Sequence, residues 1–176
     1  MLEPLKRQLT ALLFVVAIMT ALGAHANAQV TSTTGSGTTS FGNYSWQVDR
    51  APVTTTLSAV AGFSSPPPGG FFQPPLVNVA SPFTVHEVHG TFSLVTFNTF
   101  DPNNSSSCGN GSIVAQVLDQ NGNAIAAVKL QVLGPGTTNV PITGTFTTPL
   151  SVSQLALQYD VDLCGPQTVT FSLVMS

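Results

Sequence analysis

Asp160 and Asp162 are spaced so that their two carboxylates could act together on one metal ion or substrate. They lie two residues apart in a stretch of alternating apolar and polar residues, and side chains at that spacing on a β strand point to the same side. Two carboxylates on one side could bind calcium together with loop carbonyl oxygens. They could also belong to a glycosidase, although its two carboxylates normally face each other across a cleft. The alternative is the solvated side of a strand, without a ligand.

Metal-ligating residue types also gather in His86-Glu87-Val88-His89. On a strand His86 and His89 point to opposite sides, so that only Glu87 and His89 could converge on one metal ion. Such a site needs a third ligand from elsewhere, and we expect polar strand residues near a bulge instead. The sequence also lacks a Gly-x-Ser-x-Gly nucleophile motif and a phosphate-binding glycine loop. We therefore expect no enzyme and no cofactor, apart from the calcium that the aspartate pair could bind.

Four aromatic residues suggest a binding site of another kind. Tyr44 and Trp46 lie close together near the start of the expected domain, and Phe71 and Phe72 follow a run of prolines. Exposed rings can stack on the apolar faces of sugars while a few polar groups orient the hydroxyls. The alternative is that these rings close the ends of the hydrophobic core, since large aromatic side chains are mostly buried. The four residues are our candidate ligand-binding set.

The N-terminal residues predict export. Lys6 and Arg7 precede an apolar run over 11–22, and the segment closes on Ala26-Asn27-Ala28. A basic head, a short apolar core and small residues at a cleavage site are typical of a signal peptide, and this core is too short to span a bilayer. We expect residues 1–28 to be removed, with no membrane insertion afterwards. The mature protein would then be extracellular, periplasmic or at the cell surface.

The low charge content argues against one class of partner, and the two cysteines predict a disulfide. Only 6% of the residues are charged, against about 25% in average proteins. Without a basic patch to neutralise phosphates, nucleic acid is not an expected partner. Cys108 and Cys164 are the only cysteines, and in an oxidising compartment such a pair is expected to form one structural disulfide.

The remaining pattern predicts strands. Residues 29–40 are rich in Ser, Thr and Gly and predict a flexible leader, so that the domain would span 41–176. Prolines within 64–75 predict a long loop. Elsewhere apolar residues alternate with polar ones, as in 155–163 and 169–175, and no segment has a helical period. We predict an all-β fold of eight or nine strands, an antiparallel β-sandwich of jelly-roll type.

Two local signals add detail to this prediction. Asn121-Gly122 separates two alternating runs and predicts a hairpin turn. Phe83 and Val85 share one parity, whereas Val88 has the opposite one. A bulge, or a strand covered on both sides, would account for this change of parity.

The last third of the chain resembles the galactose-binding-like jelly rolls, which include many carbohydrate-binding modules. The resemblance rests on Gly144-Thr-Phe-Thr-Thr-Pro149, the strand Leu155-Ala-Leu-Gln-Tyr159 and the closing strand Val169-Thr-Phe-Ser-Leu-Val174. It implies a jelly roll that recognises carbohydrate. We therefore expect a secreted, non-catalytic module that binds glycan or another cell-surface ligand. A structural or adhesive protein acting by self-association is the alternative, because uncharged strands pair readily at their edges.

Overall fold

The computed structural model describes residues 30–64, 71–96, 111–131, 135–162 and 165–176. Residues Thr31–Ser176 form one compact unit. Its strands are β1 (Thr31–Thr39), β2 (Gly42–Arg50), β3 (Thr55–Phe63), β4 (Phe71–Phe72), β5 (Val77–Thr96), β6 (Ser112–Asp119), β7 (Ala124–Gln131), β8 (Gly136–Asp162) and β9 (Gln167–Met175). Over the described ranges no helix is long and apolar enough to cross a membrane.

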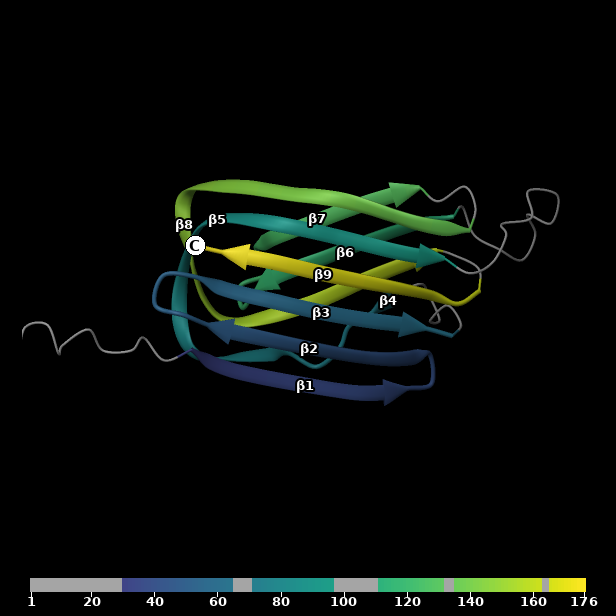
Figure 1. The fold of residues 1–176 in the computed structure, drawn as a ribbon, viewed down its shortest axis with the longest axis horizontal. Helices are drawn as coiled ribbons and strands as arrows, with labels where there is room; N and C mark the ends of the chain where they lie inside the picture. Colours follow the sequence, from purple (N-terminus) through teal and green to yellow (C-terminus); the bar gives the residue numbers. More distant parts are fainter. Residues whose placement is uncertain (1–29, 65–70, 97–110, 132–134, 163–164) are drawn as a thin grey trace, which may run out of the picture. The chain divides into compact units, whose positions relative to one another are not determined.

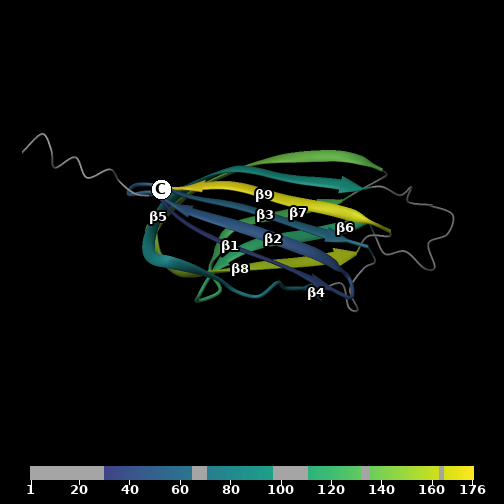
Figure 2. The same ribbon diagram turned by 60° about the horizontal axis from the view of Figure 1, so that its bottom comes forward.

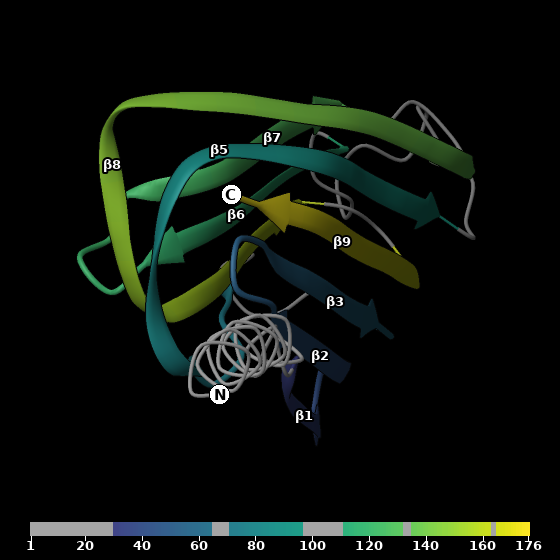
Figure 3. The ribbon, with the colours of Figure 1, turned by 60° about the vertical axis from the view of Figure 1, so that its left-hand side comes forward.

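The strands form two layers that share two long, bent strands (Figure 1). The order is β1-β2-β3-β9-β5-β8-β6-β7, with β4 pairing to β8 off this path, and every pair is antiparallel. Figure 3 shows β5 and β8 curving from one layer into the other. This arrangement confirms the predicted all-β, antiparallel fold and its number of strands.

We call the two layers A and B. Layer A contains β1, β2, β3, β9, the second half of β5 and the first half of β8. Layer B contains β4, β6, β7, the first half of β5 and the second half of β8. In Figure 2 the two layers are seen with β9 and β3 in one and β6 and the end of β8 in the other.

The core lies between the layers and follows the predicted alternation. In β9 the residues Val169, Phe171, Leu173 and Met175 are all buried, while the residues between them are at least partly accessible. The Phe171 ring meets that of Phe92 from β5 at a centroid distance of 5.1 Å. Every second side chain of a strand points to the same side, so the period of two in the sequence becomes one buried side per strand.

The predicted bulge lies where β5 bends. The register with β8 shifts between Val85 and Glu87, and Val85 and Val88 are both buried despite their opposite parity. At the bulge the backbone N–H groups of His86 and Glu87 donate to the carbonyl oxygen of Ser176, at 2.6 and 3.0 Å. The bulged chain continues to pair with β8 through the bend, so that β5 is one strand as far as Thr96.

The flexible leader expected at 29–40 is also corrected. Residues Thr31–Thr39 form β1, which pairs with β2 along its whole length. On the inner side of the sheet, β1 presents Gly35 and Gly37, which face Trp46 and Tyr44 of β2 across the register. Backbone pairing and these aromatic neighbours hold a strand that has no apolar side chain of its own, and the compact unit begins at Thr31.

The Asn121-Gly122 signal is confirmed as the turn between β6 and β7. Gly122 has a φ of 82°, in the left-handed region that favours glycine, and its N–H donates to the Asp119 carbonyl at 3.0 Å. The Asp119 carboxylate accepts the backbone N–H groups of Asn121 and Asn123 and the side-chain amide of Asn123, each at 2.8 Å. Burial raises the pKa of this carboxyl, but the hydrogen bonds outweigh it and hold the pKa below 3.8.

Two of our predictions fall outside the described residues. Cys108 and Cys164 both lie there, and so does the expected signal peptide at residues 1–28. The disulfide and the cleaved leader therefore stay predictions.

Candidate ligand-binding surface

Phe71 and Phe72 have opposite environments, although they are neighbours in the sequence. The Phe71 side chain is 53% exposed, whereas Phe72 is 8% exposed. The Phe72 ring packs in the core at 5.3 Å from the ring centroid of Phe63 and 6.2 Å from that of Tyr159. Consecutive strand residues point to opposite sides, so β4 offers one ring to solvent and buries the other. This corrects the prediction for Phe72, whose ring has no face open to a ligand.

Tyr44 and Trp46 lie on the inner side of layer A. Both are half-buried and pack against the core, and the Tyr44 ring lies 6.3 Å from that of Phe72. A Cβ atom on Gly35 would lie 2.3 Å from Cζ2 of Trp46, which shows that the indole covers this glycine. These two rings match the alternative that the sequence left open, in which aromatic residues close the core.

The exposed ring of Phe71 begins a row of residues across the outer side of layer B. Phe71 pairs with Asp160, Asp160 with Val114, and Val114 with Lys129. Phe71, Asp160 and Lys129 are exposed, and Val114 is half-buried. Residues that pair across neighbouring strands have their side chains on the same side. The structure thus places the predicted aromatic ring beside one of the two predicted aspartates.

Amide side chains surround this row. Nε2 of Gln158 donates to Oε1 of Gln73 at 3.3 Å, and Gln158 pairs with Gln116 on β6. These glutamines lie on the same outer side, one step along the strands from Phe71 and Asp160. We call the exposed ring and its polar neighbours the Phe71 surface, which consists of Phe71, Gln73, Gln116, Lys129, Gln158 and Asp160.

The predicted aspartate pair lies at this surface. Asp160 is exposed, whereas Asp162 is half-buried and already takes part in an interaction. In the part of the chain that the structure describes, no three His, Cys, Asp or Glu residues gather as a metal site would require. Calcium at Asp160 and Asp162 would need carbonyl oxygens or residues outside that part, and it stays a prediction.

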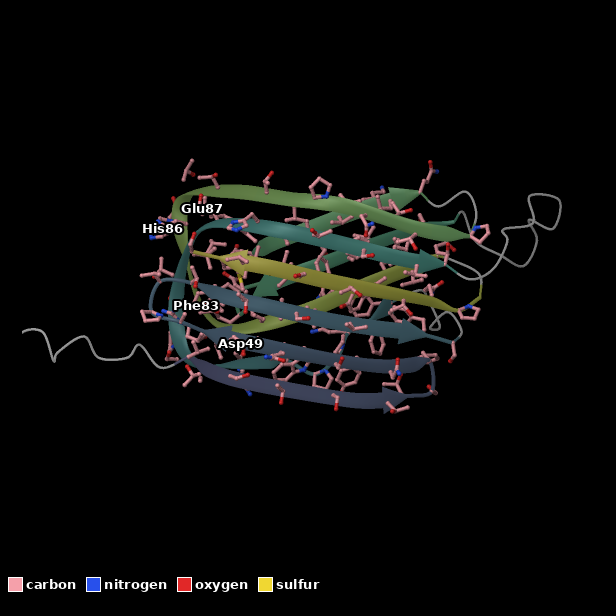
Figure 4. All side chains as sticks on the ribbon, in the orientation of Figure 1. Asp49, Phe83, His86 and Glu87 are labelled. Carbon is pink, nitrogen blue, oxygen red and sulfur yellow. The ribbon has the colours of Figure 1, made fainter. Side chains whose placement is uncertain are left out.

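The segment His86-Glu87-Val88-His89 belongs to β5. His86 and Glu87 lie at the bend of β5 (Figure 4), and their side chains are exposed. Oε1 of Glu87 accepts the hydroxyl of Ser176 at 3.1 Å. The carboxylate thus contacts the last residue of the chain, and the segment has the polar, bulged character that the sequence predicted.

Two hollows lie elsewhere on the described surface. One, of about 480 Å³, lies over β1, β2 and β3 and is lined by Thr34, Gly35, Ser36, Ser45, Trp46, Gln47, Ser58 and Val60. The other, of about 320 Å³, lies between β7 and the first half of β8 and has a largely aliphatic lining that includes Ile125, Val128 and Ile142. Neither offers an exposed aromatic ring, because the Trp46 indole packs on the inner side of its sheet.

The glutamines were missed by reasoning from the sequence. Gln116 and Gln158 come from β6 and β8, and Gln73 directly follows β4. These segments are far apart in the chain, and only strand pairing brings them together. The sequence contained one signal for this site, because Gln158 and Asp160 alternate with buried residues and therefore lie on the same polar side of their strand.

No protein-family model and no curated protein matches this chain. Solved structures do match, among them an arabinose-bound α-L-arabinofuranosidase with 11% identity and a TM-score of 0.37, over 86% of this chain and 24% of the other. The enzymatically active domain of tailspike protein 4 of bacteriophage CBA120 matches with 12% identity and a TM-score of 0.32, over 80% and 19%. This chain therefore spans about a quarter or less of those two proteins.

Carbohydrate-binding modules are also among the similar structures. A CBM4 module matches with 6% identity and a TM-score of 0.35, over 88% of this chain and 83% of the module. A family 29 module in complex with cellulohexaose matches with 10% identity and a TM-score of 0.28, over 85% and 92%.

Proposed function

We propose that this protein is a secreted, non-catalytic recognition module of jelly-roll type that binds a glycan on the Phe71 surface. The observation that carries the proposal is the Phe71 ring, which is 53% exposed and lies in register with the exposed Asp160. A ring of this kind can cover the apolar face of a sugar, while a neighbouring carboxylate accepts hydrogen bonds from its hydroxyls. Gln73 and Gln158 add amide donors and acceptors beside them.

The charge pattern favours an uncharged glycan. The surface combines one carboxylate, Asp160, with one ammonium group, Lys129, and Val114 lies between them in the central row. The whole chain has only 6% charged residues. A polyanionic chain would meet no cluster of cations here, whereas the hydroxyls of a neutral polysaccharide match carboxylate and amide groups.

The direct test is binding of the exported, full-length gene product to a panel of neutral insoluble and immobilised polysaccharides. We expect saturable binding that Phe71→Ala weakens by about tenfold or more, equivalent to about 1.4 kcal/mol or more. Val53→Ala is the matched control, because Val53 is 79% exposed and lies outside the surface, in the segment before β3. This control should bind like the wild type, and both variants should keep the wild-type melting temperature.

Two other results would change the proposal. Absence of binding by the wild type across the panel would refute glycan recognition. Binding that survives Phe71→Ala unchanged would refute this surface as its site. Repeating the assay with calcium and with a chelator tests the aspartate pair, because loss of binding on chelation would make Asp160 and Asp162 the first residues to replace.

A further inference from the structure

Among the described residues, strand β1 pairs along only one of its two edges. It is the terminal strand in the sheet order and pairs with β2 over all nine residues, without a register shift. Its sequence consists only of Thr, Ser and Gly. Natural sheets usually protect such an edge with a charge, a proline, a bulge or a very short strand, because free N–H and C=O groups invite another strand.

The other edges in the described part of the sheet have such protection. The first half of β8 contains Pro141, which cannot donate a hydrogen bond from its nitrogen. Strand β7 carries the exposed Lys129, and its register with β6 shifts near Ala124. Strand β4 has only two residues. The absence of any of these features from β1 indicates that its edge is used.

We propose that β1 pairs antiparallel with β1 of a second copy, around a twofold axis at Ser36. The sequence of residues 33–39, Thr-Thr-Gly-Ser-Gly-Thr-Thr, is the same when it is read in either direction from this residue. Ser36 would face Ser36 of the second copy, and Thr34 would face Thr38. Hydroxyl residues oppose hydroxyl residues on the outer side, and no like charges meet across the new strand pair.

The rings beneath β1 support the same pairing. The Trp46 indole covers Gly35, and Oη of Tyr44 lies 2.4 Å from where a Cβ atom on Gly37 would be. Both rings therefore reach across β1 toward the open edge, and both are only half-buried. In the twofold pair Gly35 would face Gly37 of the second copy, so each Trp46 ring would come beside the Tyr44 ring of the other copy. A twofold contact of this kind closes at the dimer.

The pairing can be tested by sedimentation of the exported, full-length gene product over a wide range of concentration. Wild-type protein should form dimers. Thr34→Lys/Ser36→Lys sets lysines opposite each other and should weaken dimerisation by about tenfold or more. Thr56→Lys/Ser58→Lys is the matched control, because it adds the same charge at exposed positions of β3, away from the edge. The control should dimerise like the wild type.

Charge reversal and tryptophan emission keep the test decisive if the lysine variant folds poorly. Mixing it with Thr34→Glu/Ser36→Glu should restore dimers, now between the two variants. Trp46 is the only tryptophan, so its emission should move to shorter wavelength as wild-type dimers form. A wild-type monomer at all concentrations would overturn the proposal. So would dimers that are insensitive to the lysines, or open-ended assemblies. The inference is independent of glycan binding, which uses the outer side of layer B.

Discussion

The carboxylate of Asp119 should contribute measurably to stability through the turn between β6 and β7. It is 3% exposed and accepts three hydrogen bonds of 2.8 Å, two from backbone N–H groups and one from the Asn123 side chain. A hydrogen bond to a charged group is worth about 1.5–3 kcal/mol. Asn121 and Asn123 are themselves exposed, so water can replace part of what is lost. We therefore expect Asp119→Ala to cost about 2–3 kcal/mol rather than the sum of three bonds.

Asp119→Asn separates the backbone contacts from the side-chain contact. Its amide oxygen can still accept both backbone N–H groups, but its NH₂ would face the NH₂ of Asn123. We expect a loss of about 1–2 kcal/mol. Asp119→Asn/Asn123→Asp reverses donor and acceptor in the side-chain pair and should recover most of that loss. Urea unfolding of the wild type, of Asp119→Asn, of Asn123→Asp and of the double variant, followed by circular dichroism, gives the coupling energy of the pair.

The contribution of Asp119 to the free energy of unfolding should depend on pH, in a direction that follows from its pKa. Because the folded-state pKa of Asp119 lies below 3.8, its stabilising effect is complete well above pH 3.8 and is lost as the pH falls through the folded-state pKa. The stability difference between the wild type and Asp119→Asn should therefore shrink in acid. A difference that stays constant from neutral to acid pH, or a double variant less stable than Asp119→Asn alone, would refute the assigned hydrogen bonds.

Three further substitutions test the core and the edge strand. Tyr159→Phe should raise the free energy of unfolding by up to about 1 kcal/mol, measured by urea unfolding. The reason is that the Tyr159 hydroxyl is buried, which raises its pKa, and has no hydrogen-bond partner among the described residues; a marked loss of stability would reveal a partner. Phe92→Ala removes a fully buried ring and should cost about 3–5 kcal/mol in the same assay, whereas a loss below about 1 kcal/mol would contradict its packing. Gly35→Ala brings a Cβ atom to 2.3 Å from the Trp46 ring, so the ring must move; we expect a lower melting temperature and a changed tryptophan emission, and an unchanged emission would place the indole elsewhere.

Much of the strand content could be predicted from local pattern. In β9 the alternating residues from Val169 to Met175 are buried as expected, because side-chain direction along a strand depends only on position in that strand. The change of parity after Val85 predicted the bulge for the same reason. The Asn121-Gly122 turn was also local, since it depends on a glycine with positive φ and on the side chain of Asp119.

Strand β1 shows where local pattern fails. Thr31–Thr39 has no apolar residue, so its sequence has no period to distinguish a strand from a leader. Pairing to β2 satisfies its backbone, and the rings of Tyr44 and Trp46 lie over its glycines. Both stabilising contacts come from another strand, and neither leaves a signal in the residues of β1 itself.

The candidate surface was likewise determined only in part by the sequence. The sequence alone identified Phe71 and Asp160 as residues able to contact a ligand, because their chemistry is a property of the side chains. It could not show which of Phe71 and Phe72 is exposed, since a two-residue strand is too short for an alternation of buried and exposed residues to be recognised. The tertiary structure decided which ring faces solvent and placed it beside Asp160, Gln73 and Gln158. Pairing of distant strands sets that register, and it depends on how all the strands bury their apolar sides together.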